Sequence, residues 1–398
     1  MPHVWLHQVT AAGRSYHPHS NALRLRRGQG GAMNIAVRIP DYSPAPGPIG
    51  GPLAWQSAQL SEDTSWVHHL GPDDIAELEA AAEKSRSDGL AILDIRKDNF
   101  ALPLVSRKVE LLRHDIMNRF GFGYMRGLPV QNYDRDTVMR MYFGLSAHLG
   151  DVVPQNRNGH MIGHVLDIGT DVNDYNKRLT QTSAELSFHS DACDVVGLLC
   201  LHTAMHGGES ALCSAIAVHD EMMRRDPDLC RALYQPVTVD RRGEIPEGKQ
   251  PWMRIPVFMW QNGEFTGYAP LPDYIRSAKR FEDAPKLTEL QERALDLFFT
   301  LCCDPQFAVR IPFEPGDFQF VHNHVVFHSR TAFEDWPNQA DKRHLMRIWI
   351  SLPEGRELHP AIAERWIHIT RGTVRGGVNI PNRKALIIPM EPMTPAFS

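Results

Sequence analysis

The chain of 398 residues has little cysteine, and its six cysteines form no CxxC pair. Cys302 and Cys303 are adjacent, which suggests neither a disulfide framework nor a zinc knuckle. The longest apolar runs are too short to span a bilayer, and a formal net charge of -5 leaves no basic field that would hold nucleic acid. We therefore expect a soluble, cytoplasmic protein with no membrane or nucleic-acid partner.

The first 40 residues contain no Asp or Glu, and they lack the continuous apolar segment of a secretory signal. We expect a loose N-terminal tail over 1–32, with Met1 and Met33 both open as the start of translation. Residues 33–95 are predicted to form an N-terminal extension that packs on the core, ahead of the main domain over 96–398. A composition of 42% hydrophobic and 22% charged residues is typical of a globular protein.

Hydrophobic periodicity predicts mixed α/β structure in the first third of the chain. It indicates helices over 73–86, over 107–119 and in a segment ending at Gly150, and short strands over 91–95 and 122–125. Ser106 is the predicted start of the second helix. A capping box at Thr288 indicates a later helix. Strand-like runs separated by turns then favour an antiparallel sandwich or barrel, at 195–201, 307–311, 318–321, 325–327 and 344–351.

The segment Phe188-His-Ser-Asp191 carries the sharpest chemical signal. In an extended segment His189 and Asp191 point to the same face and can share one metal ion. An imidazole and a carboxylate suit ferrous iron when a second histidine completes a facial triad. The pattern alone is weak, because the same spacing recurs at His219 and Glu221, where a helix is expected and the two side chains do not share a face.

Two arginines lie four residues apart in a later apolar strand. Arg343 and Arg347 therefore share one face of that strand. Guanidinium groups suit bidentate recognition of carboxylates, and an unpaired buried cation is costly. The pair predicts that this face binds anions.

Five motifs in this order resemble the Fe(II)/2-oxoglutarate dioxygenases of the taurine dioxygenase and 2,4-dichlorophenoxyacetate dioxygenase family. They are H-S-D at 189–191, G-G-E-S at 207–210, G-D at 316–317, N-x4-H-x-R at 323–330 and R-x3-R at 343–347. The resemblance spans roughly residues 120–375. It implies a mainly β fold with flanking helices (α+β), a double-stranded β-helix or jelly roll, for the domain over 96–398.

The resemblance also implies the roles of individual residues. Iron is expected on His189, Asp191 and His328, and 2-oxoglutarate on Arg343, with the hydroxyl of Ser210 as a second partner of its distal carboxylate. Arg347 takes the position that contacts the anionic group of the substrate or the carboxylate next to the metal. The spacer between His328 and Arg343 is longer than in the taurine enzyme, which leaves the loops there undefined.

Two of these assignments have alternatives. His322 and His324 would point to the same strand face as His328 and are alternative metal ligands. His328 is favoured because it stands five residues after Asn323. Arg330 either supports the metal site or makes a surface ion pair.

The resulting hypothesis is an oxygenase that hydroxylates a C–H bond of a small anionic metabolite and releases succinate and CO2. Desaturation and ring formation stay open as alternatives. A cosubstrate-independent cupin-type dioxygenase would leave Arg343 and Ser210 unexplained, and a non-catalytic sensing module is disfavoured by the complete triad. The oligomeric state is open, a homo-oligomer included.

The polar stretch over 155–186 is the predicted substrate-facing lid, because it precedes the metal ligands and lacks core periodicity. Its candidate substrate contacts are Asn156, His164 and Asn173. The alternative lid is the segment over 242–270.

Overall fold

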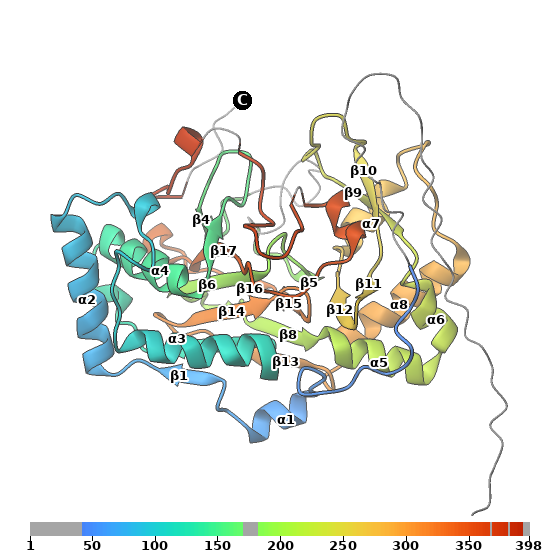
Figure 1. Ribbon diagram of the computed structural model, residues 1–398, viewed down its shortest axis with the longest axis horizontal. Helices are drawn as coiled ribbons and strands as arrows, with labels where there is room; N and C mark the ends of the chain where they lie inside the picture. The colour runs from blue at the N-terminus through green and yellow to red at the C-terminus, as the bar shows by residue number, and fades with distance from the viewer. Residues whose placement is uncertain (1–41, 170–181, 367, 381–382, 393–398) are drawn as a thin grey trace, which may run out of the picture. The chain divides into compact units, whose positions relative to one another are not determined.

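The computed structural model describes residues 42–169, 182–366, 368–380 and 383–392. Within them the chain builds two larger β-sheets, one of seven strands and one of four (Figure 1). The predicted N-terminal tail over 1–32 and the alternative start at Met33 lie outside the described residues.

The seven-stranded sheet gathers strands from almost the whole sequence. Its pairs are antiparallel except for β1 and β2, which run parallel. Strand β4 pairs with β17 off the main path, and the other strands follow in the order β1 (Val67–His69), β2 (Phe122–Arg126), β14 (Phe318–His322), β6 (Val195–His202), β17 (His344–Ser351) and β3 (Asp151–Val153), with β4 at Ile162–Val165. Because β1 belongs to the predicted extension over 33–95, that extension contributes directly to the main sheet.

The four-stranded sheet is antiparallel throughout. Its order is β13 (Ala308–Ile311), β8 (Ser210–Ser214), β15 (Val326–Arg330) and β5 (Leu186–His189). The turn after β14 leads the chain from the first sheet into the second. Three two-stranded ribbons complete the strands: β9 (Val237–Asp240) with β10 (Trp252–Ile255), β11 (Phe258–Gln261) with β12 (Glu264–Gly267), and β7 (His206–Gly207) with β16 (Phe333–Glu334).

Two groups of helices cover the sheets (Figure 1). Helices α2 (Pro72–Ser87), α3 (Val105–His114) and α4 (Arg135–Leu149) share one apolar core with the seven-stranded sheet. Helices α5 (Ala215–Arg225), α6 (Pro227–Ala232) and α8 (Glu289–Cys303) share a second core with the four-stranded sheet. The short helices α1 (Ser57–Glu62) and α7 (Pro272–Ala278) lie beside strands β13 and β9.

Two local predictions are wrong. The run over 91–95 forms a 3-10 helix at Ile92–Asp94 instead of a strand, because so short an apolar run fits either conformation. Helix α3 begins at Val105, ahead of the predicted cap Ser106, and no side chain caps its first turn. The helices over 73–86 and up to Gly150, the capping box at Thr288 and the strands of the second half are confirmed.

The architecture is the double-stranded β-helix with flanking helices that the sequence predicted. The described helices include none with the length and apolarity needed to cross a membrane.

Candidate active site

Two neighbouring strands and one turn bring His189, Asp191 and His328 together. In the register of β15 with β5, His328 stands directly opposite His189, and Asp191 follows two residues after the end of β5. Ligand atoms of the three buried residues all lie within 4.8 Å of one another. The two imidazole centroids are 4.2 Å apart. Among the described residues this is the one cluster of His, Cys, Asp and Glu with such spacing.

Side chains from distant segments hold the turn that carries Asp191. The amide of Asn323 accepts the backbone N–H of Asp191 at 3.1 Å and donates to the carbonyl of Cys193 at 3.1 Å. The guanidinium of Arg365 donates to the carbonyls of Ser190 at 2.8 Å and Asp191 at 3.3 Å. The position of the carboxylate is therefore fixed by the β14–β15 turn and by the C-terminal part of the chain.

The electrostatics of the cluster suit a divalent metal. Burial alone would raise the pKa of Asp191, but the guanidinium of Arg347 and the two imidazoles hold it well below its usual range. Burial lowers the pKa of His328 to about 3 and also lowers the pKa of His189, so both rings are neutral near pH 7. The Nδ1 of His189 hydrogen-bonds the carbonyl of Ser187 at 3.0 Å, which leaves Nε2 for a metal. Two neutral imidazoles and one carboxylate match the donor set of non-haem Fe(II).

Arg343 presents an unsatisfied cation in the interior. Its side chain is 3% exposed, its Nη2 donates to the carbonyl of Gly208 at 3.0 Å, and its Nη1 has no hydrogen-bond partner among the described residues. Burial lowers its pKa to about 10, so the group stays charged near pH 7. Ser210 lies on β8, where its hydroxyl donates to Gln319 at 2.9 Å. The free buried donor of Arg343 fits the distal carboxylate of 2-oxoglutarate.

Arg347 reaches the metal ligand itself. Its Nη1 lies 3.2 Å from Oδ2 of Asp191, and its Nε donates to the amide oxygen of Gln155 at 2.9 Å. The indole N–H of Trp349 donates to the same carboxylate at 3.0 Å. Sequence reasoning missed Gln155, Trp349 and Arg365, since their hydrogen bonds to this site join residues that are far apart in the sequence.

The competing histidines point elsewhere. His324 hydrogen-bonds Asp194 at 2.8 Å, and buried His322 lies outside the cluster of possible metal ligands. Arg330 is 6% exposed, so the alternative prediction that it makes a surface ion pair is wrong. Burial, followed by the charge of Arg343, lowers its pKa to about 10.

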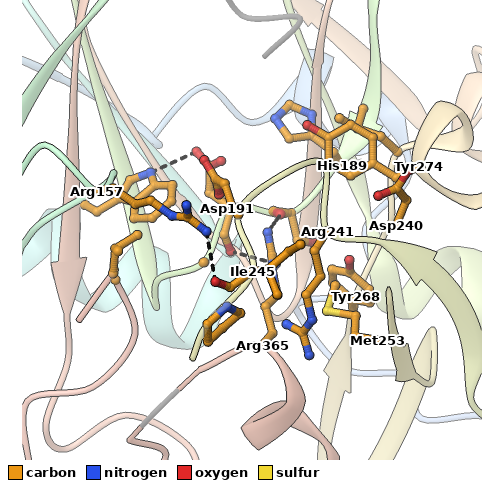
Figure 2. A pocket seen from close by; sticks show the side chains of 18 of the residues that line it. Arg157, His189, Asp191, Asp240, Arg241, Ile245, Met253, Tyr268, Tyr274 and Arg365 are labelled. Carbon is orange, nitrogen blue, oxygen red and sulfur yellow. Dashed lines mark hydrogen bonds between the residues drawn. The ribbon is translucent and has the colours of Figure 1, made fainter. Parts of the chain in front are cut away.

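A cavity of about 540 Å³ opens beside the triad. Its walls come from His189, Asp191, Arg347 and Trp349, from the loop between β9 and β10, from the segment around Tyr268, and from residues near the C-terminus. Figure 2 shows Asp191, Arg365 and Tyr268 gathered around this space.

Of the candidate substrate contacts, the described residues Asn156 and His164 do not line the cavity. The amide oxygen of Asn156 accepts the backbone N–H groups of Asn158 and His160, and His164 hydrogen-bonds His344 and the carbonyl of Pro389. Asn173 lies outside the described residues. Arg157 and Leu186 of the 155–186 segment do line the cavity, as do residues 244–247, 249, 253, 268 and 269 of the alternative lid over 242–270, so both segments contribute to its wall.

Sequence comparison identifies relatives across most of the chain. FR-33289 synthase from Streptomyces rubellomurinus is 33% identical over 331 residues, which are 80% of this chain and 95% of the relative. The taurine hydroxylase-like protein SAT17 from Stachybotrys chartarum is 27% identical over 316 residues, covering 76% of this chain and 79% of the relative.

Solved structures share the fold. An asparagine oxygenase in complex with Fe(II), 2S,3S-3-hydroxyasparagine and succinate matches with a TM-score of 0.56 at 18% identity, over 72% of this chain and 93% of its own. The non-haem iron oxygenase OrfP with Fe and alpha-ketoglutaric acid matches with a TM-score of 0.54 at 16% identity, over 77% and 99% of the two chains.

The sequence profile described as "Taurine catabolism dioxygenase TauD, TfdA family" matches residues 89–349. That interval contains the triad, Arg343 and Arg347, and the described fold from the 3-10 helix at Ile92–Asp94 to Trp349 in β17. The chain therefore belongs to the TauD/TfdA family and is an Fe(II)- and 2-oxoglutarate-dependent dioxygenase.

Proposed function

We propose that the protein hydroxylates a C–H bond of a small anionic metabolite held in the cavity beside His189 and Asp191. His189, Asp191 and His328 hold the iron, and Arg343 with Ser210 holds the distal carboxylate of 2-oxoglutarate. When bound, iron and cosubstrate supply the activation of dioxygen, with release of succinate and CO2. The chain supplies position, charge and exclusion of water.

The observation that carries the anionic substrate is a surplus cation at the cavity wall. Among the described residues Arg365 hydrogen-bonds only to backbone carbonyls and forms no ion pair, and its guanidinium lies over the ring of Tyr268 at 4.9 Å. In contrast, Arg241 and Lys249 of the β9–β10 loop both pair with the carboxylate of Glu364. Arg365 is therefore free to receive an anionic group of the substrate.

Arg347 is the second cation near the same point. It contacts the side chain of Asp191, while Arg365 contacts the backbone carbonyl of Asp191. An anion in the cavity would thus meet two guanidinium groups next to the iron. The apolar side chains Ile245, Met253 and Leu271 of the cavity wall would cover the carbon skeleton and keep water out.

Hydroxylation is the outcome favoured by the intact carboxylate of Asp191, because halogenating relatives replace this residue by a small one. The names of the relatives agree: SAT17 is called hydroxylase-like, and the asparagine oxygenase was crystallised with a hydroxylated amino acid. Desaturation and ring formation use the same residues.

The six free thiols support the cytoplasmic location, because a reducing compartment keeps thiols free.

The test is release of succinate in air with Fe(II), ascorbate and 2-oxoglutarate, screened against a panel of amino acids, other carboxylates and sulfonates. The product is expected to gain one oxygen atom by mass spectrometry. Asp191→Ala should abolish turnover. Arg365→Ala should raise the KM for the metabolite found, whereas Arg371→Ala, which removes an exposed arginine outside the cavity, should not. Equal turnover of the acid and its methyl ester would contradict an anionic substrate.

A further inference from the structure

Arg330 lies directly across the strand from Ser210. In the register of β15 with β8, Arg330 pairs with Ser210, as His328 pairs with Leu212. Residues two apart on a strand point to the same face, so the side chain of Arg330 points to the face of the iron ligand His328. Side chains directly opposite on neighbouring strands are in contact range. Arg330 and Ser210 thus stand side by side on the face that carries the metal site.

Arg330 and Arg343 approach the same aromatic ring. The guanidinium carbon of Arg330 is 4.8 Å, and that of Arg343 5.1 Å, from the centroid of Phe333. Arg330 is the last residue of β15, whereas Arg343 directly precedes β17. Two buried like charges near one ring repel each other. The carboxylate of Asp335 acts on both groups and that of Asp167 on Arg330, but burial still lowers the pKa of each arginine, so these acids offset only part of the cost.

The two guanidinium groups have spare donors. Nε and Nη1 of Arg330 and Nη1 of Arg343 are buried, and no hydrogen-bond partner for them exists among the described residues. The Nη2 of Arg330 is held by the carbonyl of Ala184. The neighbouring acid Asp335 uses Oδ1 to accept the backbone N–H of Arg343 at 2.7 Å. A bidentate anion would satisfy the donors that remain.

We propose that Arg330 is a second cationic ligand of the distal carboxylate of 2-oxoglutarate, which it binds together with Arg343 and Ser210. The inference rests on the assignment of Arg343 and Ser210 in the proposed function. It makes Arg330 a residue that selects 2-oxo acids with two carboxylates over those with one. It also predicts that the product succinate, which keeps this carboxylate, depends on Arg330 for binding.

The experiment measures dissociation constants of oxo acids for the Fe(II)-loaded protein without oxygen, by calorimetry and by the charge-transfer absorption of the bound chelate. Arg330→Met should weaken 2-oxoglutarate by roughly tenfold or more, because a buried charged partner is lost. The same variant should bind 2-oxobutyrate, which keeps the chelating end and lacks the distal carboxylate, as the wild type does. Arg330→Lys should recover part of the loss for 2-oxoglutarate.

Two further variants make the outcomes distinct. Ser329→Ala, on the opposite face of β15, should leave both constants unchanged. If Arg343→Met weakens 2-oxoglutarate and Arg330→Met does not, the inference about Arg330 is wrong and the proposed function stands. If neither variant weakens it, the cosubstrate assignment itself falls. Equal weakening of 2-oxoglutarate and 2-oxobutyrate by Arg330→Met would show that Arg330 only supports the metal site, and would overturn the inference.

Discussion

Gly208 makes room for the side chain of Arg343, the proposed cosubstrate ligand, because it has no side chain of its own. Its φ of +72° lies in the left-handed region, and a Cβ there would meet Nε of Arg343 at 2.7 Å and Cδ at 2.9 Å. Its own carbonyl accepts the hydrogen bond from Nη2 of Arg343 at 3.0 Å. The guanidinium of Arg343 thus packs directly on the backbone of Gly208. This close contact explains why the second motif has glycine at this position.

Gly208→Ala is therefore expected to displace Arg343 and to raise the dissociation constant of 2-oxoglutarate. The matched control is Gly263→Ala, which has a similar φ of +84° but open space around its Cβ. Both changes carry about 1–2 kcal/mol of backbone strain, so both should lower the free energy of unfolding. Calorimetric titration with 2-oxoglutarate distinguishes the two variants. Equal cosubstrate affinity in both would contradict a role of Gly208 in positioning Arg343.

Sequence motifs predicted the residues that carry chemistry better than those that position them. His189, Asp191 and His328 were predicted from the resemblance of the five motifs, and one strand pair and one turn bring them together. Gln155 and Arg365 were not, because they contact Arg347 and the Asp191 turn from segments that are far away in sequence. Such contacts depend on how loops return to the sheet, which periodicity does not encode.

At the scale of elements, one buried ion pair ties the C-terminal part of the chain to the sheet. Asp194 precedes β6 and accepts from Nε of Arg375 at 2.9 Å, from His324 at 2.8 Å and from the backbone N–H of Leu352 at 2.8 Å. Burial alone would raise the pKa of Asp194, but the bonds from His324 and Arg375 hold it at about 2.

This pair predicts a pH dependence of stability. Because the folded pKa of Asp194 lies below the usual aspartate value of 3.8, its contribution to stability is present above about pH 4 and is lost as the pH falls towards 2. The contribution is about 2 kcal/mol. Asp194→Asn should lower the free energy of unfolding at pH 7 by about 3–5 kcal/mol, because buried Arg375 loses its partner.

Urea denaturation at pH 7 and at pH 3 measures both effects. Asp296→Asn, at an exposed position of α8, is the control and should change stability by less than about 0.5 kcal/mol. A wild-type protein that loses no stability between pH 4 and pH 3 would argue against the Asp194 contribution.

The loop between β9 and β10 forms part of the cavity wall, and we expect it to cover a bound substrate. It contributes Arg241, Glu244, Ile245 and Lys249 to the cavity wall, and Arg157 of the 155–186 segment donates to the carbonyl of Ile245 at 3.0 Å. Both predicted lid segments therefore meet at this point, which Figure 2 shows at Arg157 and Ile245.

Trypsin cleavage after Arg241, Arg242 and Lys249 is expected to slow when a metabolite that supports turnover is added to the anaerobic complex with iron and 2-oxoglutarate. Binding under the loop orders it and removes the open conformations that a protease needs. Mass spectrometry of the fragments follows the rate. Cleavage after the exposed Arg371 provides the internal control, and unchanged loop cleavage at saturating metabolite would exclude a lid role.

Local patterns predicted elements well where the chain repeats a clear period, as in α2, α4 and β17. They failed over 91–95, where the run is too short to separate a strand from a helical turn. They also gave no sign that α3 continues as a π-helix at Asp115–Arg119, since that irregularity depends on how the segment packs against β2 and β14.

At the scale of the whole molecule, ligand binding and folding are coupled. The candidate iron ligands lie on β5, just after it and on β15 of one sheet, while Arg343 directly precedes β17 and Arg347 lies on β17 of the other. A metal and a cosubstrate bound together would thus join the two sheets. Anything that binds only the folded chain stabilises it by mass action.

Fe(II) without oxygen should raise the Tm by a few degrees, and 2-oxoglutarate should add to this rise chiefly when iron is present. At a ligand concentration of 100 times Kd the gain is about 2.7 kcal/mol. Differential scanning fluorimetry with and without a chelator measures it. His189→Ala should abolish the iron effect, and His202→Ala, at an exposed histidine, should keep it; an undiminished shift in His189→Ala would remove that residue from the metal site.

The strands and the loops of this chain do different jobs. Strands β5, β15 and β17 carry the triad and the arginines, whereas much of the cavity wall comes from the β9–β10 loop and from residues 377–379 near the C-terminus. We therefore expect substitutions in the β9–β10 loop to change the preference for the metabolite while the affinities for iron and 2-oxoglutarate stay the same. Substitutions at 377–379 should disturb both, because Arg375 and Gly377 bond to Asp194 and Ala192 next to the Asp191 turn.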